Sequence, residues 1–71
     1  MKEYLVIFEQ AGNNYSAYVP DLPGCISTGK TLEELEINIK EAITLYIDTL
    51  KEDGQPIPEP SVSSKLIKVA A

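Results

Sequence analysis

The sequence contains no histidine, no arginine and no tryptophan, and Cys25 is its single cysteine. One thiol cannot form a disulfide within the chain, and without histidine it cannot complete a zinc site of nitrogen and sulfur ligands. Nucleophilic catalysis by Cys25 or by a serine has no imidazole to act as the base. We therefore predict no catalytic residue, no metal ligand and no cofactor, and a protein that is not an enzyme.

Long apolar runs are also missing. The longest one, residues 5–8, is far shorter than the roughly 20 residues that cross a bilayer. The N-terminus meets a strand-like segment directly and has no signal-peptide pattern. We expect a cytoplasmic location and no association with a membrane.

Positive charge is scarce. Eleven acidic residues against six basic ones give a formal net charge of −5, and all six basic residues are scattered lysines. Nucleic-acid binding draws much of its affinity from Lys and Arg at phosphates, so direct binding of nucleic acid is not expected. An acidic surface suits a basic protein partner, which it attracts over a distance. The same charge also serves solubility alone, and both interpretations stay open.

The residues that are present predict a single α+β domain over residues 1–71. Residues 4–8 are β-branched and aromatic, and residues 15–19 alternate in polarity, which is typical of a hairpin with a five-residue loop. The expected fold is an antiparallel sheet with one helix packed on one face, in the order β-β-β-α-β. Its predicted elements are strands 4–8, 15–19 and 25–28, a helix from 32 to about 53, and a fourth strand 65–69.

Capping residues delimit the helix. Thr31 and Glu34 have the spacing of a capping box, and Gly54 has the character of a helix stop. Helical spacing of apolar residues predicts the stripe that faces the sheet: Leu32, Leu35, Ile39, Ala42, Ile43, Tyr46, Ile47 and Leu50.

A proline-rich turn follows the second strand. Pro20 and Pro23 cannot donate ladder hydrogen bonds, and Gly24 permits a backbone angle that other residues avoid. We expect the carboxylate of Asp21 to accept hydrogen bonds from nearby backbone N–H groups of this turn.

Four apolar residues have no place in a core made of one sheet face and one helix. Leu5 and Ile7 lie on the second face of the first strand, and Ile37 and Leu45 project away from the main helix stripe. Scattered exposed apolar residues are normal. Taken together, however, these four predict an interface between copies of the chain, in a dimer or a tetramer.

Residues 24–31 match the text of a P-loop, G-x-x-x-x-G-K-T. A phosphate loop follows a buried parallel strand in a βαβ unit, whereas here a proline-broken turn precedes the match. The segment is better explained as a strand that leads into a helix cap, and nucleotide binding is not expected.

The run YSAYVPDLPGC at 15–25, GKTLEE at 29–34, and residues 41–43 and 54–58 resemble the HicB-like antitoxin family. The resemblance implies a partly RNase-H-like β-β-β-α-β domain that forms dimers or tetramers. It also implies a partner, a small basic ribonuclease toxin of the HicA kind, which the antitoxin neutralises by covering it. The resemblance implies a structural role for the residues that carry the family motif: Pro20, Asp21, Pro23, Gly24, Thr31, Glu34 and Gly54.

Many members of that family carry a C-terminal DNA-binding domain, which we do not expect here. Two other functions stay open. One is a stand-alone oligomeric module that binds a small ligand or another protein. The other is a metal-dependent nuclease relic, for which the sheet region offers only Asp21 and Glu9 as acidic residues.

Overall fold

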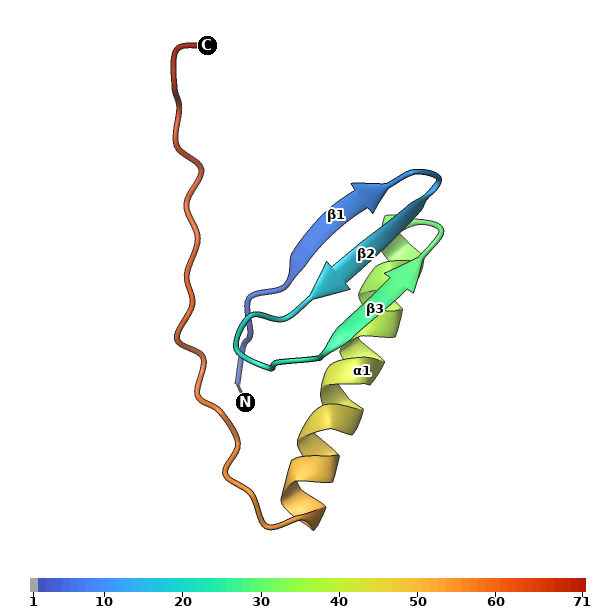
Figure 1. Cartoon of the computed structure of the whole chain (residues 1–71), viewed down its shortest axis with the longest axis vertical. Coiled ribbons are helices and arrows are strands. Elements are labelled where there is room, and N and C mark those ends of the chain that lie inside the picture. The colour runs from blue at the N-terminus through green and yellow to red at the C-terminus, as the bar shows by residue number, and fades with distance from the viewer. Residues whose placement is uncertain (1) are drawn as a thin grey trace.

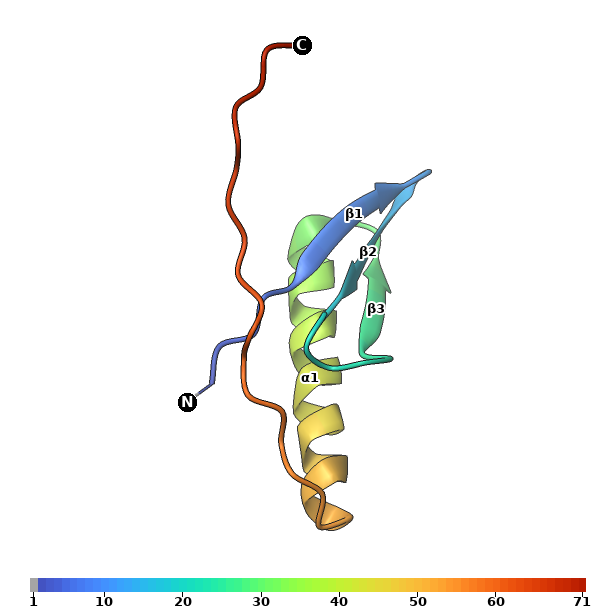
Figure 2. The same ribbon diagram turned by 60° about the vertical axis from the view of Figure 1, so that its left-hand side comes forward.

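The computed structural model describes residues 2–71. Three antiparallel strands lie side by side in the order β1-β2-β3, and one long helix, α1, packs across one face of this sheet (Figures 1 and 2). The expected α+β class is confirmed. The elements are β1 Ile7–Ala11, β2 Asn14–Tyr18, β3 Ile26–Gly29 and α1 Leu32–Glu52.

The β1–β2 hairpin is tighter than predicted. Ala11 pairs with Asn14, so only two residues, Gly12 and Asn13, form the loop. Gly12 has a φ of 60° at the first loop position, as a type II′ turn requires. The five-residue loop expected from the sequence was wrong, because the ladder continues through Gln10 and Ala11.

Strand β1 also begins later than predicted, at Ile7 rather than at Tyr4. The register explains this shift. Ile7 pairs with Tyr18, so residues 4–6 would have to pair with residues 19–21. Pro20 lies in that stretch and has no N–H to donate to β1, while the N–H of Val19 points to the other side and donates to the carbonyl of Cys25 at 3.2 Å.

Helix α1 has the two ends that the sequence predicts. At its start, the hydroxyl of Thr31 accepts a hydrogen bond from the N–H of Glu34 at 3.1 Å. The Glu34 carboxylate accepts a hydrogen bond from the N–H of Lys30 at 3.4 Å. In a regular capping box it would accept from the N–H of Thr31, one residue later. At its end, Gln55 N–H donates to Leu50 O at 2.9 Å and Gly54 N–H to Lys51 O at 3.1 Å, which is a Schellman motif.

The core lies between the helix and the sheet. Leu22 and Leu35 are completely buried, and Tyr4, Val6 and Tyr46 pack around the buried cluster. Leu32, which the sequence placed in the apolar stripe, is instead 46% exposed at the first turn of the helix. The buried residues are Ala17, Val19, Leu22, Cys25, Leu35 and Ile39.

The fourth strand, predicted at residues 65–69, does not form within this chain. After α1 the chain turns back and runs as an extended segment on the β1 side of the molecule (Figure 1). Residues 65–69 are exposed and take part in no ladder of the described sheet. Their strand-like sequence has no sheet edge to pair with in the path that the chain takes.

Candidate protein-interaction surfaces

The proline turn holds the C-terminal segment of the chain. One carboxylate oxygen of Asp21 accepts hydrogen bonds from the N–H of Ser61 at 3.0 Å and the N–H of Val62 at 3.2 Å, and the other accepts from the Ser61 hydroxyl at 2.7 Å. The expectation that Asp21 would bind N–H groups of its own turn was therefore wrong. The turn is closed by the backbone: Leu22 N–H donates to Val19 O and Cys25 N–H to Leu22 O, both at 3.0 Å.

These contacts have an electrostatic consequence. The charged carboxylate is stabilised by three hydrogen bonds, from the Ser61 hydroxyl, the Ser61 N–H and the Val62 N–H. These bonds lower the pKa of Asp21 below its ordinary value. The contact between the turn and the C-terminal segment therefore depends on the ionised form of Asp21.

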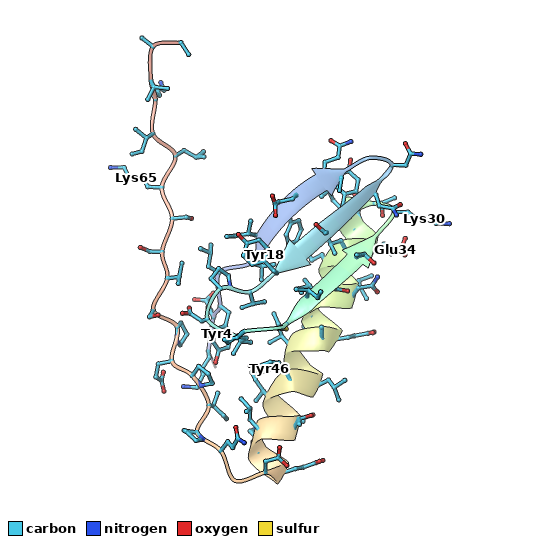
Figure 3. The ribbon with its side chains drawn as sticks, in the orientation of Figure 1. Tyr4, Tyr18, Lys30, Glu34, Tyr46 and Lys65 are labelled. Carbon is cyan, nitrogen blue, oxygen red and sulfur yellow. The ribbon has the colours of Figure 1, made fainter. Side chains whose placement is uncertain are left out.

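Two further contacts fix the beginning of the same segment. The Tyr4 hydroxyl donates to the carbonyl of Pro58 at 2.5 Å, and Lys2 forms an ion pair with Glu59 at 2.6 Å. Tyr4 lies between the sheet and this segment (Figure 3). The segment 58–62 is thus tied to the body at the N-terminal residues that precede β1 and at the proline turn.

The other motif residues serve the backbone. Pro20, Pro23 and Gly24 shape the turn between β2 and β3, and Gly24 has a φ of 81°. Thr31, Glu34 and Gly54 cap the helix, as described above. Glu34 and Lys30 mark the start of the helix in Figure 3. None of these side chains gathers into a reactive cluster.

The apolar residues proposed for an interface form two separate surfaces. Ile37 and Leu45, 61% and 69% exposed, line one open groove of about 490 Å³ on the outer side of α1. Lys40, Glu41 and Asp48 border this groove. We call it the helix groove. Leu5 and Ile7, which are half-buried, lie away from it.

The second surface is the sheet face that α1 leaves uncovered. Ile7 pairs with Tyr18, and Tyr18 pairs with Ile26, so the three side chains form a row across all three strands on one face. Ala17, next to Tyr18, is buried against the helix, which places this row on the opposite face. Ile26 is 68% exposed. Tyr18 and Ile26 were not among the interface residues predicted from the sequence, although their alternation with Ala17 and Ser27 indicates this face.

The structure also locates the residues that the sequence offered for metal, thiol or phosphate chemistry. No group of three or more Cys, Asp or Glu side chains within residues 2–71 is placed to hold a metal ion. Burial raises the pKa of the Cys25 thiol, which makes it a weak nucleophile. The P-loop text at 24–31 spans β3 and the helix cap, so it forms no phosphate-binding loop.

The chain matches a family model over residues 4–70, and that family is described as the HicB_like antitoxin of bacterial toxin-antitoxin systems. The chain belongs to the HicB-like antitoxin family. The fold agrees, because a chain in the solved HicA3 and HicB3 toxin-antitoxin complex superimposes with a TM-score of 0.72 and 28% identity. The match covers 84% of this chain and 70% of that one.

Relatives of this HicB-like protein occur in archaea and in a phage. A UPF0150 protein of Thermoplasma acidophilum is 47% identical over 58 residues, which are 82% of this chain and 84% of the relative. An uncharacterized 14.9 kDa protein of Haemophilus phage HP1 is 41% identical over 56 residues, or 79% of this chain. The match spans only 42% of that phage protein.

Among residues 2–71, no helix combines the length and the apolar content that crossing a membrane requires.

Proposed function

We propose that this protein binds and neutralises a small basic ribonuclease toxin of the HicA kind, in the cytoplasm, through protein–protein contact and without a reaction of its own. The observation that carries the proposal is the structural match to a chain of a toxin-antitoxin complex, at an identity high enough to support more than the fold. The family membership points the same way.

The charge of the chain supports a basic partner. With a formal net charge of −5, its field attracts a positively charged protein and speeds their encounter. Helix α1 carries much of the acidic charge on exposed positions: Glu33, Glu34, Glu36, Glu41, Asp48 and Glu52. An antitoxin that covers an RNA-binding protein has to replace the negative charge of RNA, and this surface supplies it.

We further propose that the protein is a homo-oligomer. The helix groove around Ile37 and Leu45 and the apolar row of Ile7, Tyr18 and Ile26 are two surfaces that contact with another copy would remove from water. Leu5 adjoins the second of these surfaces, because Tyr4 and Val6 on either side of it pack against the core.

The test starts from affinity capture of the tagged protein at low salt in lysate of its source organism, followed by mass spectrometry. A small basic protein that elutes in stoichiometric amount is then purified and mixed with RNA. We expect the captured protein to degrade the RNA, and we expect an equimolar amount of the antitoxin to keep the RNA intact.

An unrelated acidic protein of the same net charge is the control, since it reproduces the field without the specific contact. RNA that is degraded equally with and without the HicB-like protein would contradict the proposed neutralisation. RNA that survives equally with either acidic protein would show that the protection is only electrostatic.

A further inference from the structure

The segment from Val62 to Ala71 has the sequence of a strand but no sheet. Its apolar side chains lie in solvent: Leu66 is 99% exposed, Ile67 68% and Val69 77%. Figures 1 and 2 show the segment leaving the body and running free of it in both views, and Lys65 lies on this free part in Figure 3. We call residues 65–69 the free strand.

The anchor before the free strand fixes where it starts. Asp21 holds the N–H groups of Ser61 and Val62 and the Ser61 hydroxyl. Within residues 2–71, no hydrogen bond beyond Val62 joins the segment to its own sheet or helix. The free strand therefore leaves the molecule from a fixed point.

The sheet offers one unprotected edge. The order β1-β2-β3 leaves the outer sides of β1 and β3 without strand neighbours. On β3 the amide of Asn38 donates to the carbonyl of Thr28 at 2.9 Å and occupies part of that edge. No side chain among the described residues caps β1 in this way, and neither β1 nor the free strand contains proline. A bare edge of this kind is a template for another strand.

The surroundings of the β1 edge suit a strand that is apolar on both faces. On the helix side, an open groove of about 750 Å³ runs between α1 and the first strand region. Phe8, Ile43 and Ile47 form part of its lining, together with charged side chains from both elements: Lys2, Glu3, Glu36, Lys40, Asp48 and Lys51. On the other side lie the half-buried Leu5 and Ile7. Alternation along the free strand sends Ile67 and Val69 to one side and Leu66 to the other, so both sides receive apolar partners.

The charge of the free strand indicates which protein offers it a sheet edge. Lys65 and Lys68 are the only charged side chains from Val62 onward, and setting them aside leaves the rest of the chain with a formal net charge of −7. A small basic toxin would repel these lysines, whereas the acidic body of a second copy attracts them. In this pairing Lys68 and Leu66 lie on the same side of the free strand, and the exposed Glu9 of β1 lies on that side too.

We propose that two copies of this chain exchange their free strands, each adding residues 65–69 to the β1 edge of the other. The exchange is reciprocal, so the two copies are related by a two-fold axis. Each copy then covers the β1 edge of the other and the groove between α1 and the first strand region. This inference rests on the self-association part of the proposed function and gives it a specific contact. It also explains why residues 4–8, at the start of this edge, are apolar on both sides although α1 covers only one of them.

The experiment measures the mass in solution and the neighbours of the free strand in the full-length protein. We expect the mass of two chains by light scattering at micromolar concentration. In an equal mixture of isotope-labelled and unlabelled protein, we expect intermolecular NOEs between the methyl groups of Ile67 or Val69 and the ring of Phe8. The double variant Ile67→Asp/Val69→Asp should raise the dimer dissociation constant by at least about tenfold, because it places two charges against the apolar side chains of Phe8, Ile43 and Ile47.

Ser63→Asp/Ser64→Asp is the matched control, since it adds the same charge to the same segment outside the free strand. Helix content should stay unchanged in both variants, because Ile67 and Val69 contact nothing in their own chain's core. An intact dimer in the Ile67→Asp/Val69→Asp protein, or NOEs that arise only within one chain, would overturn the strand exchange and leave self-association standing. A wild-type protein that is monomeric at these concentrations would overturn both.

Discussion

Asp21 and Ser61 are 40 residues apart in the sequence, and two hydrogen bonds join them in the fold. The carboxylate accepts from both the backbone N–H and the hydroxyl of Ser61, and from the N–H of Val62. A residue that belongs to the family motif as a turn former thus also determines the path of the C-terminal segment.

This contact should weaken in acid. The pKa of Asp21 is lowered in the folded protein, so the contact is complete above the ordinary Asp pKa of about 3.9 and is lost as the pH falls through the lower, folded value. We expect the amide NMR signals of Ser61 and Val62 to titrate together with a midpoint below about 3.9. Asp21→Asn should abolish this titration. A midpoint at or above the ordinary value would contradict the assigned hydrogen bonds.

Gly29→Ala should destabilise the fold. A Cβ at position 29 would lie 2.8 Å from the backbone nitrogen of Leu35 and 3.0 Å from its Cα, which is too close for either to stay in place. Because the first turn of α1 would have to move away from β3, we expect a loss of about 1–3 kcal/mol of unfolding free energy. Urea denaturation measures this loss.

Thr28→Ala is the control for Gly29→Ala, at the neighbouring exposed position of the same strand. It changes strand propensity without a steric clash, and should cost less than about 1 kcal/mol. If the two variants unfolded at the same urea concentration, the close approach of Gly29 to the helix would not limit the packing.

Thr31→Ala should weaken the helix start. The Thr31 hydroxyl accepts the N–H of Glu34, which otherwise has no partner in the first turn. We expect a loss of about 1 kcal/mol in unfolding free energy. Thr44→Ala, at an exposed position within α1 where the hydroxyl donates to Lys40 O, is the control and should be neutral or stabilising. A Thr31→Ala protein as stable as the wild type would show that the cap contributes nothing.

The parts of the fold that local chemistry determines could be predicted from the sequence. Thr31, Glu34 and Gly54 act within a few residues of themselves, so the helix was placed to within one residue at its end. The start of β1 could not be placed in this way. It depends on pairing across the hairpin, where Pro20 removes the partner that residues 4–6 would need.

Contacts between distant segments were harder still. Nothing near Asp21 in the sequence points to Ser61, because a carboxylate is equally suited to its own turn and to a segment 40 residues away. Residues 65–69 do have a strand-like pattern, but a local pattern does not specify the strand with which a segment pairs. Pairing also depends on the path of the chain, and the contact at Asp21 directs residues 65–69 away from their own sheet.

Ile37 and Ile39 distinguish the proposed interface from the core. Ile39 is 3% exposed and belongs to the buried cluster, whereas Ile37, two residues away, is 61% exposed at the helix groove. Ile39→Asp buries an unpaired charge and should unfold the domain, seen as lost helicity by circular dichroism. Ile37→Asp should keep the helicity and weaken self-association, seen as a lower average mass in light scattering. Normal helicity with an unchanged mass would remove the helix groove from the interface, and lost helicity in Ile37→Asp would place Ile37 in the core instead.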